Sequence, residues 1–301
     1  MSTIPSIPAP PFHIVVAGGC HAYGWPIGDS SSFIQVMLAS APPATLSTLA
    51  PVNLRNRTPL LPLLREQPAD VVILQLGNYE TLASIKKHLR AVLRLSPPAQ
   101  SRQESDTGVP LDADTVFRPT PAWRRRVLSK QLYSRSFGYM SPPLFDAETF
   151  RLRYAQLLAD LQSETHAPRL IVALSPIPCA DHLIRNYRSQ AAEILRQVCN
   201  ELPLRLTSRV HYLDSAQALG IENQNTQALS AGIFADDLHL NRRGHLLLGN
   251  ALASVLHQNL WATLPEAQSA SPTCTITSLD PKDAECSHPP ASSHARLEQA
   301  R

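Results

Sequence analysis

The stretch Ala69-Asp70-Val71-Val72-Ile73-Leu74-Gln75-Leu76-Gly77-Asn78 decides the fold class. Its four consecutive aliphatic residues, Val71 to Leu74, are typical of a strand that is covered on both faces of a parallel sheet. The run ends at a glycine, and a helix is predicted from about Glu80 to Leu95. In open parallel sheets, the loop between such a strand and its helix carries functional residues.

The same alternation continues through the chain. Further strands are predicted at His13 to Ala17, around Pro51 to Leu54, at Leu170 to Leu174 and at Val210 to Leu213. Helices are predicted at Phe33 to Ser40, Thr58 to Glu66, Ala122 to Tyr133, Asp146 to Ser163, His182 to Leu202 and Asn241 to about Leu260. This order predicts a three-layer, flavodoxin-like α/β fold with a mainly parallel five-stranded sheet.

One domain, residues 13–261, contains all of these elements. Residues 1–12 hold four prolines and no Lys or Arg, so we expect an extended arm rather than a secretory signal. Residues 96–140 are predicted to be a flexible and basic insertion, because they lack a hydrophobic period. Residues 262–301 are rich in Ser, Thr, Pro and Ala and contain no glycine, which predicts a disordered tail.

Composition indicates which cellular compartment and which classes of partner to expect. The formal net charge of +3 is too small to indicate nucleic-acid binding, and no apolar run is long enough to span a membrane. The cysteines form neither a CxxC pair nor a metal-binding spacing, and their odd number argues against a disulfide framework. They are Cys20, Cys179, Cys199, Cys274 and Cys286. We therefore expect a cytoplasmic protein.

A basic segment, residues 118–135, has no acidic residue, and none occurs between Asp114 and Asp146. It carries Arg118, Arg124, Arg125, Arg126, Lys130 and Arg135. One interpretation is a solvated helix face or a lid packed on the domain. The other is a contact with a polyanion or with anionic lipid.

Two stretches carry the chemistry. Gly18-Gly19-Cys20-His21-Ala22-Tyr23-Gly24 follows the first strand, and Asp236-Asp237-Leu238-His239-Leu240-Asn241 precedes the last helix. A nucleophile, a base and an orienting acid are the groups that acyl transfer requires. Alternating strands and helices can bring the two ends of the chain into one cleft.

These residues resemble the SGNH/GDSL hydrolases over about residues 13–261. In that family the nucleophile lies in a Gly-Asp-Ser turn after strand one, and here Cys20 stands at the serine and Gly19 at the aspartate, with Gly24 following. The family's Asp-x-x-His block is matched by Asp236 and His239. Its Gly-x-Asn-Asp block corresponds to Gly77-Asn78-Tyr79-Glu80, in which the asparagine stands one position earlier than in the family.

The resemblance implies an ester or thioester hydrolase with a small-molecule acyl substrate, no cofactor and no metal. In this mechanism His239 deprotonates or pairs with Cys20, Asp236 orients His239, and Asn78 stabilises the oxyanion. A thioester acyl-enzyme can also pass its acyl group to an alcohol or an amine, so an acyltransferase is a variant. The family's second block needs a glycine that is missing between Gly28 and Gly77, and a backbone N–H near Asn56 is the substitute.

Several alternatives stay open at this point. The literal Gly28-Asp29-Ser30 offers Ser30 as nucleophile, although Asp29 and Ser30 are better interpreted as helix caps. The chain could also be a non-catalytic binding or scaffold protein with degenerate motifs, a redox sensor, or a phosphate-binding Rossmann protein.

Other polar residues near these motifs are expected to be structural. His21 is predicted to point away from Cys20, in a structural or substrate-lining role. Cys179 and Cys199 are predicted to pack in the core, His245 to pack or hydrogen-bond locally, and Glu80 to cap a helix.

Overall fold

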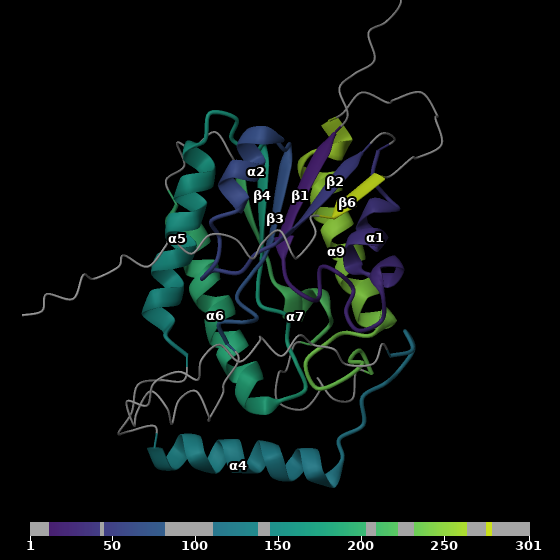
Figure 1. Ribbon diagram of the computed structural model, residues 1–301, viewed down its shortest axis with the longest axis vertical. Coiled ribbons are helices and arrows are strands. Elements are labelled where there is room, and N and C mark those ends of the chain that lie inside the picture. The colour runs from purple at the N-terminus through teal and green to yellow at the C-terminus, as the bar shows by residue number, and fades with distance from the viewer. Residues whose placement is uncertain are drawn as a thin grey trace, which may run out of the picture.

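The computed structural model describes residues 12–42, 45–81, 111–137, 145–202, 209–221, 232–263 and 275–278. Its centre is a six-stranded sheet in the order β5-β4-β3-β1-β2-β6 (Figure 1). All strand pairs are parallel. The strands are β1 (His13–Gly18), β2 (Leu46–Pro51), β3 (Val71–Gln75), β4 (Leu170–Leu174), β5 (Arg209–Leu213) and β6 (Thr275–Ser278). The predicted α/β fold with a parallel sheet is therefore confirmed.

Helices cover both faces of the sheet. One face packs against α1 (Phe33–Leu38), α7 (Ser215–Ala218) and α9 (Arg242–Asn259), and the other against α2 (Leu60–Glu66), α5 (Ala147–Ser163) and α6 (His182–Glu201). The short 3-10 helices η1 (Asp29–Ser31) and η2 (Trp261–Thr263) flank α1 and α9. Along β3, Val71 and Ile73 enter the first core, and Val72 and Leu74 enter the second. Because successive strand residues point to opposite faces, a strand covered on both sides must be apolar throughout.

Strand β2 lies earlier in the chain than the sequence predicts. The prediction around Pro51 to Leu54 is wrong, since the strand covers Leu46–Pro51. Its Ser47 and Thr48 are buried, and Thr48 Oγ1 lies 3.0 Å from Nε2 of His13 on β1. A strand with buried polar residues is not detected by a hydrophobicity pattern.

Strand β6 is the exception to the disordered tail predicted for residues 262–301. Thr275–Ser278 pairs in parallel with Leu46–Leu49 of β2, so the prediction is wrong for these four residues. A β-branched Thr-Ile-Thr segment has strand propensity, and the outer side of β2 offers unpaired backbone groups. The predictions for residues 1–11 and 82–110 lie outside the described residues.

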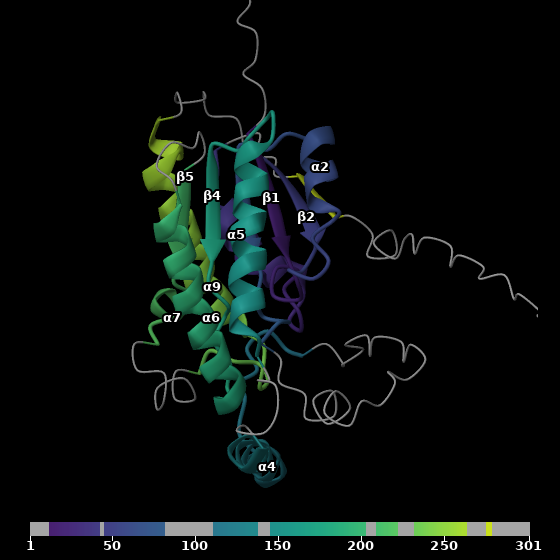
Figure 2. The same ribbon diagram turned by 90° about the vertical axis from the view of Figure 1, so that its left-hand side faces the viewer.

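Helix α4 (Pro121–Phe137) contains the predicted helix Ala122 to Tyr133 and extends it. It lies across the molecule beyond the carboxyl ends of the strands (Figures 1 and 2). Within the described residues, no helix combines the length and the apolarity needed to cross a bilayer.

Candidate active site

Cys20 lies in a tight turn that follows the carboxyl end of β1. The turn is closed by the Ala22 N–H, which donates to the Gly19 carbonyl at 2.9 Å, and by the Trp25 N–H, which donates to the Cys20 carbonyl at 3.0 Å. Gly24 has φ +72°, and a Cβ there would lie 2.5 Å from the Gly28 carbonyl oxygen. Only glycine fits that position. The turn leaves the Cys20 side chain partly exposed.

Asp236 and His239 lie on a short loop that is fixed from both sides. An antiparallel bridge between Phe234 and Leu240 closes it, and Asp236 Oδ1 accepts hydrogen bonds from the Leu238 and His239 N–H groups at 2.7 and 2.8 Å. These main-chain bonds are local, which is why the Asp-x-x-His spacing places the acid and the ring side by side.

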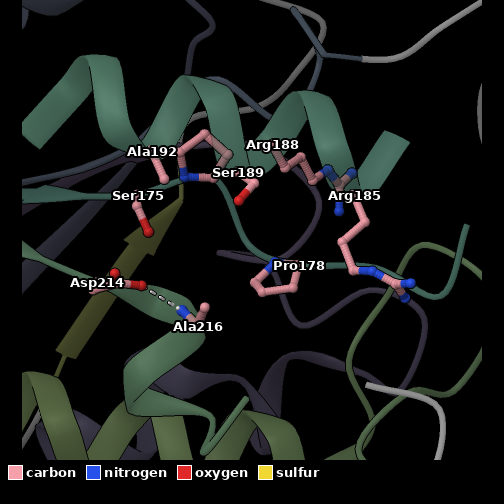
Figure 3. A pocket seen from close by; sticks show the side chains of 9 residues that line it. Ser175, Pro178, Arg185, Arg188, Ser189, Ala192, Asp214 and Ala216 are labelled. Atoms are coloured by element: carbon pink, nitrogen blue, oxygen red, sulfur yellow. Dashed lines mark hydrogen bonds between the residues drawn. The ribbon is translucent and has the colours of Figure 1, made fainter. Parts of the chain in front are cut away.

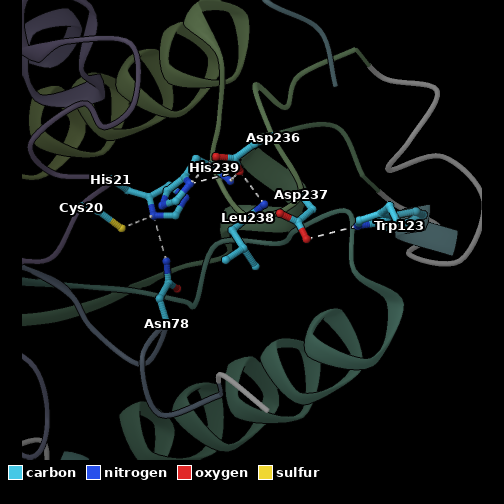
Figure 4. Close-up of polar contacts among 8 residues, drawn as sticks. All are labelled: Cys20, His21, Asn78, Trp123, Asp236, Asp237, Leu238 and His239. Carbon is cyan, nitrogen blue, oxygen red and sulfur yellow. Dashed lines mark hydrogen bonds and ion pairs between the residues drawn. The ribbon is translucent and has the colours of Figure 1, made fainter. Parts of the chain in front are cut away.

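Asp236 holds the imidazole of His239. Nδ1 of His239 lies 2.8 Å from Asp236 Oδ2 (Figure 4). Cys20 also interacts with this ring, which leaves Nε2 for the sulfur. Burial disfavours the charged ring, but the hydrogen bonds and charges of Asp236 and Cys20 outweigh it and raise the pKa of His239 to about 10. Burial likewise disfavours the Asp236 carboxylate, and the bond to His239 more than compensates, so its pKa is lowered. The ring is thus an imidazolium near neutral pH.

His21 does not point away from Cys20, so that prediction is wrong. Its Nδ1 lies 3.6 Å from Cys20 Sγ, and its ring centroid lies 5.2 Å from that of His239. The side chain is 1% exposed. Burial lowers the pKa of His21 well below its usual value, and the positive charges of His239 and Arg188 act in the same direction. His21 is therefore a neutral second imidazole beside the thiol.

Asn78 joins this group through an amide of defined orientation. Its Oδ1 accepts a hydrogen bond from the Ile177 N–H at 2.9 Å, so its Nδ2 is the atom that faces His21 Nδ1 at 3.2 Å (Figure 4). Since an amide nitrogen only donates, His21 Nδ1 must accept and Nε2 carries the proton. Within the described part of the chain, the second hydrogen of Asn78 Nδ2 makes no further hydrogen bond.

Two buried arginines of α6 hold the loop that orients Asn78. Arg188 Nη1 donates to the Ile177 carbonyl at 2.6 Å, and Arg185 Nη1 donates to the carbonyls of Cys179 and Ala180 at 3.3 and 3.5 Å. Both side chains are less than 5% exposed and line a small pocket between this loop and α6 (Figure 3). Through these hydrogen bonds the two arginines hold the loop in place.

The N–H of Asn56 is not available as an oxyanion donor. It donates to Asn53 Oδ1 at 2.8 Å, the Arg55 N–H donates to the same oxygen at 2.9 Å, and the Leu54 N–H donates to Glu80 Oε1 at 3.0 Å. The amides of Leu54, Arg55 and Asn56 therefore do not replace the missing glycine as oxyanion donors, because hydrogen bonds within the protein already use them. By contrast, the Cys20 N–H makes no hydrogen bond within the described residues.

The ring of Tyr79 lies against Gly19, directly before Cys20. A Cβ on Gly19 would lie 2.4 Å from Tyr79 Cε2, so the ring covers this glycine. Tyr79 is 43% exposed and thus forms an aromatic wall at the rim of the site. No sequence pattern predicts this contact, because it depends on how two loops meet.

The remaining candidates lie apart from the reacting groups. Ser30 is exposed in η1, and the side chain that caps α1 is Ser32, which accepts from the Gln35 N–H at 3.3 Å. His245 accepts from the Phe33 N–H at 3.0 Å and therefore supports the same helix. Among the described residues, no cluster of His, Cys, Asp and Glu could hold a metal ion.

The segment after residue 110 reaches the His239 loop. Trp123 Nε1, on α4, donates to Asp237 Oδ2 at 3.2 Å, and the Phe117 N–H donates to the Phe234 carbonyl at 2.8 Å (Figure 4). The basic segment thus begins beside the candidate catalytic histidine.

Comparison with known proteins gives a fold-level result. No family model matches the chain, and no curated protein matches it. Among solved structures, it resembles an acetylxylan esterase from Geobacillus stearothermophilus, with 12% identity, 86% of this chain and 97% of that chain covered, and a TM-score of 0.46.

Two further similarities are of the same order. An α/β hydrolase from the metagenome of Lake Arreo, Spain, has 12% identity and a TM-score of 0.46, covering 81% of this chain and 96% of that chain. A salicylyl-acyltransferase of a tetracycline biosynthetic pathway has 12% identity and a TM-score of 0.44, covering 86% and 57%.

Proposed function

We propose that the protein is an acyl hydrolase that cleaves ester or thioester bonds through Cys20, His239 and Asp236. The observation that carries this proposal is the continuous contact from Asp236 Oδ2 through the His239 ring to Cys20, with the pKa of His239 raised to about 10. An imidazolium beside a partly exposed sulfur stabilises the thiolate, which is the nucleophilic form of cysteine.

The proposed reaction has two stages. The Cys20 sulfur forms a bond to the carbonyl carbon, and the resulting oxyanion accepts hydrogen bonds from Asn78 Nδ2 and from the Cys20 N–H. As the carbon–oxygen or carbon–sulfur bond to the leaving group breaks, His239 Nε2 gives that group its proton. His239 then takes a proton from water, whose oxygen attacks the thioester and releases the acid and the thiol. An alcohol or amine in place of water would give acyl transfer.

Hydrolysis of short-chain p-nitrophenyl esters and matched thioesters tests this function. The substitutions Cys20→Ala and His239→Ala should each lower kcat/KM by about a thousandfold, as for other nucleophile and base deletions. Cys199→Ala is the matched control, because Cys199 lies on the far part of α6 and should leave the rate unchanged. Retention of activity by both site variants would refute the proposal.

A non-catalytic binding protein of the same fold is the second candidate. The loop after β2 favours it, since the N–H groups of Leu54, Arg55 and Asn56 are all engaged and supply no oxyanion donor. Limiting iodoacetamide at neutral pH separates the two. Burial raises the pKa of Cys179 to about 11 and that of Cys199 to about 12, so an activated Cys20 should be labelled well before either. Labelling of Cys20 no faster than Cys199 would favour the binding protein.

A further inference from the structure

Helix α4 presents two different faces. Toward the body of the protein, Val127 is buried and Trp123 donates to Asp237 at 3.2 Å while its ring packs edge-on against Phe117 at 5.4 Å. These contacts fix one side of the helix at the carboxyl end of the sheet, where α4 is the outermost described element (Figures 1 and 2).

The opposite face, which we call the outer face of α4, exposes apolar and cationic side chains together. Leu128 and Leu132 are 54% and 55% exposed, and they lie one turn apart. Arg124 and Arg125 are also exposed. With 3.6 residues per turn, these four positions fall within about a third of the helix circumference, on the side away from Trp123 and Val127.

The charge of this region is of one sign. Residues 115–145 contain Arg118, Arg124, Arg125, Arg126, Lys130 and Arg135 and no acidic residue, although the whole chain has a net charge of only +3. A local excess of this kind attracts a polyanionic surface. The exposed leucines are not explained by charge alone, because two large aliphatic side chains in water gain nothing from an electrostatic contact.

We propose that the outer face of α4 binds the surface of an anionic phospholipid bilayer, with the helix lying along the membrane plane. The arginines would pair with lipid phosphates while the leucines enter the acyl boundary, which is the pattern of interfacial helices. A nucleic acid or other soluble polyanion would satisfy the arginines but offers no apolar phase to the leucines. Because Trp123 links α4 to the loop that carries His239, such binding would bring this loop close to the membrane.

Co-sedimentation of the full chain with vesicles tests this inference. Vesicles of phosphatidylcholine and phosphatidylserine in equal amounts should bind the protein, and vesicles of phosphatidylcholine alone should not. Leu128→Ala with Leu132→Ala should weaken binding at least about tenfold, because both substitutions remove apolar surface that would enter the bilayer. Arg124→Glu with Arg125→Glu should weaken it by about a hundredfold or more, because each substitution reverses a charge near the membrane surface. Added salt should weaken the binding of the unaltered protein.

Matched control variants distinguish binding by the outer face of α4 from nonspecific binding by other exposed residues. Leu152 and Leu246 are 57% and 47% exposed on α5 and α9, and their double alanine variant should bind as well as the unaltered chain. Arg169 and Arg209 stand exposed at the amino ends of β4 and β5, the other end of the sheet, so Arg169→Glu with Arg209→Glu should also have little effect.

Three results would overturn the proposal. They are equal binding to both kinds of vesicle, a loss of binding in the control variants as large as in the α4 variants, and binding to heparin without binding to vesicles, which would identify a soluble polyanion as the partner. Circular dichroism confirms that each variant is folded. Cys20→Ala should bind vesicles normally, so this proposal and the proposed function fail independently.

Discussion

His21 shows how the state of one residue follows from its neighbours. The Ile177 N–H fixes the carbonyl end of the Asn78 amide, the amide nitrogen must then donate to His21 Nδ1, and the buried ring is neutral. His21 thus holds Asn78 and lies against the sulfur of Cys20, which suits a positioning role distinct from the role as base that we propose for His239.

Replacing His21 by Phe should therefore impair the reaction without removing it. The aromatic volume stays, but Asn78 Nδ2 loses its acceptor, so we expect kcat to fall about tenfold, with KM little changed, because oxyanion stabilisation is a transition-state effect. The unsatisfied buried amide should also lower the free energy of unfolding by about 1–3 kcal/mol. Ester hydrolysis and urea denaturation measure the two effects.

The exposed His257 on α9 provides the control. His257→Phe should change neither kcat nor stability noticeably. If His21→Phe behaves in the same way, the hydrogen bond between His21 and Asn78 contributes to neither the reaction nor the stability.

His245 makes stability depend on pH. Burial lowers its pKa to about 4, while the unfolded chain has the ordinary value of 6.5. The unfolded state therefore binds a proton first as the pH falls, so the stabilisation is complete above pH 6.5 and is lost as the pH falls toward 4. The difference corresponds to about 3 kcal/mol at full extent.

His245→Gln should remove this dependence, because its side-chain oxygen can still accept the Phe33 N–H but does not titrate. Urea unfolding at neutral pH and near pH 4.5 should show a smaller loss of stability for the variant than for the unaltered chain. A variant with the same loss as the unaltered chain would mean that other groups control the acid sensitivity.

Helices α1 and α9 approach each other at Gly249. A Cβ there would lie 2.5 Å from Val36 Cβ and 2.7 Å from the Phe33 carbonyl oxygen. Alanine is favoured over glycine by about 1 kcal/mol in a helix, but overpacking typically costs about 1–3 kcal/mol and the carbonyl cannot rotate away.

The clash should outweigh the helix propensity, so Gly249→Ala is expected to be destabilising by about 1–2 kcal/mol. Thermal unfolding followed by circular dichroism should show Tm lower by several degrees, at about 2–4 °C per kcal/mol for a domain of this size. The neighbouring Asn250 is exposed, and Asn250→Ala should leave Tm unchanged or slightly raised. A higher Tm for Gly249→Ala would show that the helices can separate freely.

At the scale of elements, the sequence predicts those strands that are apolar throughout. The ends of β1, β3, β4 and β5 lie within two residues of their predicted ends. In β1, β3 and β4 the reason is burial on both faces, which leaves a nearly continuous aliphatic run, whereas β5 is only partly buried. β2 is not found in this way because two of its buried residues, Ser47 and Thr48, are polar. β6 is not predicted either, because it is a short strand that pairs with the outer side of β2.

At the scale of the molecule, topology explains why the candidate site could be proposed from sequence. All strands run parallel, so the loops after β1 and β3 emerge at the same end of the sheet, where the loop before α9 meets them. The parallel arrangement therefore predicts that Cys20, Asn78 and His239 lie close together, but it does not predict how their side chains are oriented. The orientation of His21 and the cover of Tyr79 over Gly19 depend on loop-to-loop contacts that no spacing encodes.

The outer edge of the sheet provides the last prediction. β6 pairs in parallel with β2, and Ile276 stands opposite Ser47. Proline lacks the N–H that a strand interior requires, so Ile276→Pro should release β6 while the core remains folded. Hydrogen exchange should then accelerate in a peptide covering β2, since part of its backbone loses its partner, and a peptide covering the central β4 should exchange as before.

Ile276→Val is the matched control, because valine keeps both the N–H and the strand propensity. An edge strand without cover also invites pairing between molecules, so the proline variant should associate at high concentration where the valine variant stays dispersed. If exchange in β2 is the same in both variants, the six-stranded sheet is wrong at this edge and β2 is its true border, which would restore the five-stranded sheet that the sequence predicts.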